Sequence, residues 1–98
     1  MPLAQYAVKP RDRTLAELYP ELRAVHLDHG NLSAAAGWCG ATVETESTRP
    51  GQWTTQLVLQ DDSRAGPGDW VVRAELPTGL QVFAAYEDAE FMRRYEPA

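Results

Sequence analysis

The sequence lacks both the cysteines of a disulfide framework and the long apolar run of a membrane span. Its 98 residues include one cysteine, Cys39, which excludes an internal disulfide. No apolar run approaches the roughly 20 residues that a transmembrane helix needs. The stretch after Met1 lacks the basic start and the apolar segment of a signal peptide. We therefore expect a cytoplasmic protein that does not associate with membranes.

Positive charge is also scarce. One lysine, Lys9, and eight arginines stand against 14 acidic residues, so the formal net charge is −5. Binding to nucleic acid requires clustered cations that neutralise phosphates. Nucleic acid is therefore an unexpected partner for this chain.

The remaining composition indicates one globular domain. Hydrophobic residues make up 44% of the chain and charged residues 23%, which is too apolar for disorder. A domain of about 100 residues buries roughly two-thirds of its unfolded surface. It can fold without a metal or another cofactor, and we expect none. We place the domain at residues 21–98 and treat residues 1–20 as an amino-terminal extension that packs on it.

Prolines and glycines divide the chain into pieces of four to ten residues, which suit strands and short helices. Strands are expected over residues 5–8, 22–27, 41–46, 53–60, 70–74 and 80–84. Helices are expected after Thr14 as N-cap, from Asn31 to Cys39 with Gly40 as a left-handed stop, and over residues 87–95. Pro67 and Gly68 predict a type II turn before the strand that begins at Trp70.

This order of elements predicts an α+β fold. Short connections between successive strands favour antiparallel pairing. We expect a single small domain with a twisted, mainly antiparallel sheet, or a partly open barrel, of about five strands. Two or three short helices cover its face and edge.

Cys39, His26 and His29 form the set that most suggests catalysis or metal binding. A nucleophilic cysteine needs a lowered pKa, but Cys39 is expected at a helix carboxyl end, where the dipole disfavours a thiolate. Structural zinc sites use closely spaced ligand pairs, which this set, even with Asp28, does not supply. We interpret Cys39 as a packed thiol, and expect neither a metal site nor enzymatic activity.

The three tryptophans are the best candidates for a binding surface. We expect two of them in the core and one on the surface. Trp53 follows the polar loop that contains Arg49, so Trp53 and Arg49 are the candidate partner-binding residues. An alternative is a small-molecule pocket between helix and sheet, lined by Trp38, Val72 and Phe83.

Three motifs in order support a family resemblance: Gly-Trp-Cys-Gly at residues 37–40, Gly-Pro-Gly-Asp-Trp at residues 66–70, and Phe-x-x-x-Tyr-Glu at residues 91–96. Together they resemble the small phage and prophage protein family named for its Pro-Gly-Asp-Tyr-Gly motif, over about residues 22–97. Trp70 stands here for the tyrosine, and Val71 for the glycine. The family has no assigned enzymatic activity. The resemblance therefore implies a phage or prophage origin and no particular mechanism.

These observations favour a non-enzymatic phage or prophage accessory protein that acts as a protein-interaction module in the host cytoplasm. Its partner would be a host or phage protein, and inhibition of a host or defence factor is one such role. The alternative function is binding or sequestering a small molecule. Exposed sheet edges also leave homo-oligomerisation open.

Overall fold

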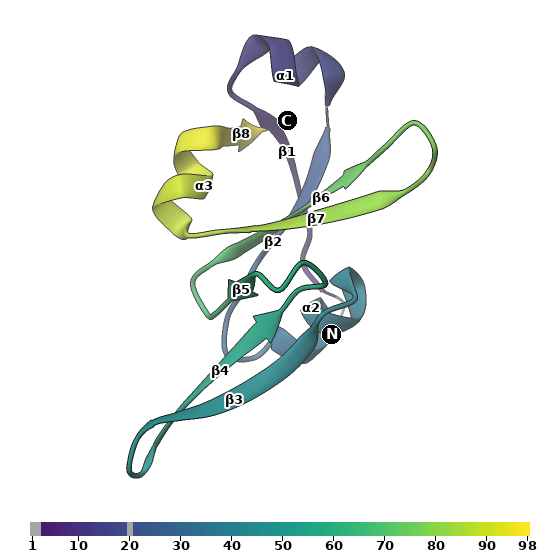
Figure 1. Ribbon diagram of the computed structural model, residues 1–98. Coiled ribbons are helices and arrows are strands. Elements are labelled where there is room, and N and C mark those ends of the chain that lie inside the picture. The colour runs from purple at the N-terminus through teal and green to yellow at the C-terminus, as the bar shows by residue number, and fades with distance from the viewer. Residues whose placement is uncertain (1–2, 20) are drawn as a thin grey trace.

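Two antiparallel sheets and three short helices make up the part of the chain that the computed structural model describes, residues 3–19 and 21–98 (Figure 1). The larger sheet contains β1 (Tyr6–Pro10), β2 (Leu22–His26), β6 (Trp70–Glu75), β7 (Gln81–Tyr86) and β8 (Tyr95–Pro97). The smaller sheet contains β3 (Thr42–Arg49), β4 (Gln52–Val58) and β5 (Arg64–Ala65). The helices are α1 (Arg13–Leu18), α2 (Leu32–Cys39) and α3 (Asp88–Arg94). The α+β class is confirmed.

The strand order of the larger sheet is β7-β6-β2-β1-β8, and all neighbours are antiparallel. Neither sheet closes into a barrel within residues 3–19 and 21–98, so the open twisted sheet is the alternative that forms. The expected number of about five strands fits the larger sheet alone. The separate three-stranded sheet was not anticipated.

The first strand is an inner strand of the larger sheet. Tyr6 of β1 lies opposite Ala24 of β2, and Val8 lies opposite Pro97 of β8. Both sides of β1 are therefore hydrogen-bonded. Residues 6–10 belong to the sheet itself, whereas the sequence analysis treats them as part of an extension that packs on the domain.

The hydrophobic core lies on both faces of the larger sheet. One face packs on α2 and the smaller sheet, and its buried residues include Val25, Val71, Cys39 and Leu57. The other face packs on α3, with a buried cluster of Val8, Leu22, Ala24, Trp70, Val72 and Phe91. Because side chains alternate along a strand, the neighbours Val71 and Val72 serve opposite clusters. This explains the continuous apolar run at the start of β6.

The residues that cap α1 and α2 agree only in part with those expected from the sequence. The expected N-cap of α1, Thr14, is wrong: Asp12 caps the helix, and its carboxylate accepts a hydrogen bond from the Leu15 amide at 3.1 Å. Gly40 ends α2 as predicted, with a positive φ of 68°. Asn31 does precede α2, but its side chain bridges the Asp28 amide and the His26 carbonyl instead of capping the helix.

The turn before β6 is confirmed. Gly68 has a φ of 95°, and the Asp69 amide donates to the Gly66 carbonyl at 3.0 Å. The Asp69 carboxylate in turn accepts from the Gly66 amide at 2.9 Å. These bonds fix the point at which Trp70 enters the sheet.

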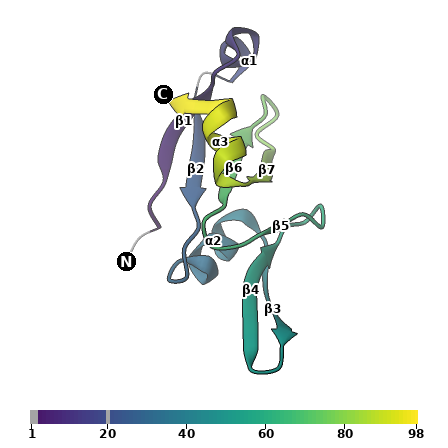
Figure 2. The ribbon, with the colours of Figure 1, turned by 90° about the vertical axis from the view of Figure 1, so that its left-hand side faces the viewer.

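The hairpin of β3 and β4 projects away from the larger sheet (Figures 1 and 2). It accounts for the elongated outline of 49 × 27 × 27 Å. Strand β3 runs to Arg49, so the connecting turn is shorter than the sequence suggested. Helices α1 and α3 lie at the opposite end of the molecule (Figure 1).

Candidate functional site

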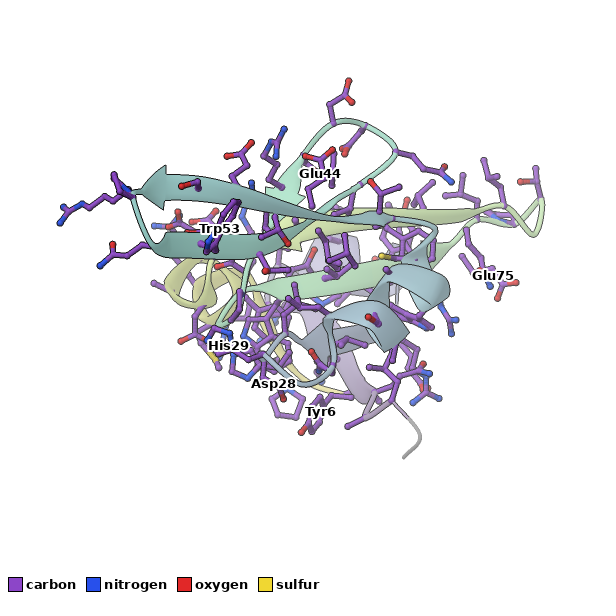
Figure 3. All side chains as sticks on the ribbon, turned by 90° about the horizontal axis from the view of Figure 1, so that it is seen from below. Tyr6, Asp28, His29, Glu44, Trp53 and Glu75 are labelled. Atoms are coloured by element: carbon purple, nitrogen blue, oxygen red, sulfur yellow. The ribbon has the colours of Figure 1, made fainter. Side chains whose placement is uncertain are left out.

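Trp53 lies near the outer end of the projecting hairpin and is the most exposed large apolar side chain of the described residues. Its exposed fraction is 69%, whereas Trp70 is buried and Trp38 is half-buried. Trp53 is therefore the exposed tryptophan, as expected, but only Trp70 belongs to the buried core, and Trp38 packs against the core as a partly buried side chain. Figure 3 shows Trp53 on the outlying part of the hairpin. An indole in this position is available to another molecule.

The two faces of the hairpin differ in polarity. Every second side chain of β4 points to the same face of the hairpin. From the core outward, this face carries Leu57, Thr55 and Trp53. Leu57 is fully buried, and the hydroxyl groups of Thr45 and Thr55 form a hydrogen bond of 3.2 Å across the strands. These contacts attach the strand that carries Trp53 to the core and to β3.

The opposite face is charged. Glu44 and Glu46 of β3 lie on it, and both pair with Arg64 of β5, at 3.1 and 3.8 Å. One cation thus serves two carboxylates. These exposed pairs contribute little to stability, but they leave this face negative.

Arg49 is the last residue of β3. The pairing register shifts between Ser47 and Arg49, and the Ser47 hydroxyl donates to the Arg49 carbonyl at 3.0 Å. Its strand partner, Gln52, directly precedes Trp53. The structure therefore brings the two predicted partner-binding residues to the same end of the hairpin.

The charge of the molecule is unevenly distributed. Residues 27–69, which contain α2 and the smaller sheet, hold six of the 14 acidic residues and two of the nine basic ones. The rest of the chain is nearly balanced. The end of the molecule that carries Trp53 is therefore the acidic end.

The predicted pocket of Trp38, Val72 and Phe83 does not assemble. Trp38 and Phe83 do meet, with ring centroids 5.3 Å apart and nearly perpendicular, and the Arg73 guanidinium lies over the Trp38 ring. Val72, however, faces the other side of the sheet, in the cluster of Trp70 and Phe91. The alternation of β6 puts Val72 and Arg73 on opposite faces.

Cys39 and the histidines are also separated. Cys39 is buried in the cluster under α2, and burial raises the pKa of its thiol. His26 lies opposite Trp70 in the sheet and on the same face, away from that cluster. These positions fit the interpretation of Cys39 as a packed thiol.

An aromatic stack around Trp70 was not anticipated from the sequence. Its indole lies between the parallel rings of His26 and Phe91, with centroids at 4.3 and 4.0 Å. The indole N–H donates to the Asp88 carboxylate at 2.8 Å. Asp88, at the start of α3 and after an apolar strand, was the sequence feature that could have indicated an acceptor for the indole N–H.

Two further kinds of functional feature, a metal-binding cluster and a membrane-spanning helix, are absent from the described residues. The side chains there include no set of three histidines, cysteines or carboxylates placed to share a metal ion. None of the described helices has the length and apolar character that crossing a bilayer requires.

Comparisons with protein-family models, with curated proteins and with solved structures find no match to this chain. What the protein does is therefore inferred from its own residues.

Proposed function

We propose that this protein is a non-enzymatic interaction module that docks on another protein through the β3–β4 hairpin, with Trp53 as its anchor. The observation that carries this proposal is the exposure of Trp53 on a projecting hairpin. Tryptophan dominates the binding energy of protein interfaces when a partner pocket buries it. A rigid hairpin places the indole without a large ordering cost.

The charge of this end of the molecule favours a basic partner. An acidic surface accelerates association with a basic one and disfavours acidic competitors. Arg49 adds a guanidinium at the rim, where it can donate to carbonyl or carboxylate groups of the partner. The fitting partner is a protein with a basic surface and an apolar pocket for one indole.

A phage or prophage origin, suggested by the resemblance of residues 22–97, agrees with this role. Host enzymes that bind nucleic acid carry basic grooves. An acidic module that occupies such a groove would inhibit the enzyme. The proposed partner is therefore a host or defence protein of this class.

The test is binding of the purified protein to partners captured from host lysate, with Trp53→Ala as the key variant. Loss of a central tryptophan costs about 2 kcal/mol or more, so the Kd should rise at least about 30-fold. Arg49→Ala should weaken binding less, because a rim residue stays partly hydrated. Binding should also weaken as salt is added.

Leu80→Ala is the matched control. Leu80 is another exposed apolar side chain, 60% accessible, on the loop between β6 and β7. This variant should bind like the parent protein. A captured partner whose Kd is the same for Trp53→Ala and the parent would refute the hairpin as the docking element.

A further inference from the structure

An apolar groove of about 250 Å³ lies on the α3 side of the larger sheet, between that sheet and α1. Leu22, Val72 and Val82 contribute to its floor from three adjacent strands, and Tyr19 follows α1 at one wall. Val82 is still exposed in this groove. A ligand that filled the groove would remove this apolar surface from water.

One side of the groove is polar and consists of hydrogen-bond donors. The Tyr95 hydroxyl donates to the Tyr86 hydroxyl oxygen at 3.1 Å, which leaves the Tyr86 proton free for an acceptor. Burial raises the pKa of the Tyr95 hydroxyl above its ordinary value, which favours the protonated form that donates to Tyr86. The Arg94 guanidinium lies beside them, 5.7 Å from the centre of the Tyr86 ring.

Of the described residues that line the groove, Arg94 is the one that carries a charge. Glu90 accepts hydrogen bonds from both Arg93 and Arg94, so one carboxylate is shared by two guanidinium groups. Arg94 uses its Nε atom in this contact. Its terminal amino groups remain as donors toward the groove, because a guanidinium carries five N–H groups.

We propose that this groove binds a small carboxylate with an apolar body, whose carboxylate is held by Arg94 and Tyr86 and whose body lies on Val72 and Val82. Arginine and a hydroxyl donor match a carboxylate and repel or leave unpaired an ammonium group. The volume lies just below the about 300–1,000 Å³ typical of pockets for drug-sized ligands. The fitting ligand is therefore a medium-chain or aryl-alkyl acid.

The experiment uses octanoate, with octylamine as the ligand of opposite charge. Titration is followed by backbone amide chemical shifts of the whole protein. Octanoate should bind with millimolar affinity, as expected for so few atoms, and should shift the amides of Val72, Ala74 and Val82. Octylamine should bind at least about 10-fold more weakly, since it cannot accept from Arg94.

Variants separate this site from general stickiness. Arg94→Leu should raise the Kd for octanoate about 10-fold or more, and Tyr86→Phe should raise it less. Arg73→Leu is the matched control, because Arg73 lies over Trp38 on the opposite face of the sheet, and it should leave the Kd unchanged. Equal binding of octanoate and octylamine, shifts confined to another surface, or an unchanged Kd in a folded Arg94→Leu protein would each overturn the proposal.

Discussion

The three tryptophans show how one residue type serves three purposes in a short chain. Trp70 is buried between two rings and uses its N–H on Asp88. Trp38 is half-buried against Phe83 and beneath Arg73. Trp53 extends into solvent from the hairpin. Burial and partners, rather than residue identity, decide which tryptophan stabilises the fold and which is free to bind.

This contrast predicts that the same substitution has a large effect on stability at one position and almost none at the other. Trp70→Ala should lower the free energy of unfolding by about 3–5 kcal/mol, because it removes a buried aromatic side chain and leaves a cavity. Trp53→Ala should change it by less than about 0.5 kcal/mol. Urea unfolding followed by circular dichroism measures both. Similar losses in the two variants would mean that Trp53 packs against the protein in solution.

At the scale of elements, helix α2 and its C-cap include two glycines, of which the backbone conformation requires one, Gly40, and does not require the other, Gly37. Gly40 has a φ of 68°, and a Cβ atom there would lie 2.9 Å from the Gln60 amide nitrogen. Gly37 is within the exposed side of the helix, and a Cβ atom there would meet nothing within 4 Å. The helix stop at Gly40 was predictable from the sequence, and the open space around Gly37 explains why a glycine is not required there.

Alanine substitutions at these two positions should therefore change the unfolding free energy in opposite directions. Gly40→Ala should lower the unfolding free energy by about 1–2 kcal/mol, the cost of a left-handed conformation with a Cβ atom. Gly37→Ala should raise it by about 0.5–1 kcal/mol, because alanine restricts the unfolded chain. Thermal unfolding of the two variants side by side checks this. A destabilised Gly37→Ala protein would show that another group approaches the helix there.

At the scale of the whole molecule, the projecting hairpin, which is the proposed binding element, lies apart from most of the hydrophobic core. The Cα radius of gyration is 14.1 Å, against about 13 Å for a typical chain of 100 residues. The hydrophobic clusters lie on the two faces of the larger sheet and reach the hairpin only at Leu57. In the outer half of the hairpin, the side chains that the structure describes, those of residues 46, 47 and 49–54, are all exposed.

A shortened hairpin should therefore fold normally. Thr45 and Thr55 are strand partners, so Asn-Gly in place of residues 46–54 would connect them by a two-residue turn. We expect the unfolding free energy to change by less than about 1 kcal/mol, since exposed residues are removed. Binding of the partner should be lost, and scattering should report a smaller radius of gyration. Unfolding of this variant would show that the outer hairpin supports the core.

The sequence predicts turns and the ends of elements more readily than it predicts which strands pair with each other. The φ of Gly68, the stop at Gly40 and the strand at Trp70 follow from one residue and its immediate neighbours. The edge strand β8 has only three residues, too few for an alternating pattern in the sequence. It forms by pairing with β1, where Pro97 lies opposite Val8. The exposure of Trp53 was predictable because a tryptophan beside a polar loop has little to bury it.

By itself the sequence determined where the chain turns, which residues alternate along each strand and which tryptophan faces solvent, because these depend on backbone preferences and side-chain periodicity within a few residues. Tertiary structure alone decided that α2 covers the face of Val71 and α3 the face of Val72. It also decided that β1 lies inside the sheet and that Tyr86, Arg94 and Val82 share one groove. Those outcomes depend on contacts between segments far apart in the chain, for which no local pattern exists.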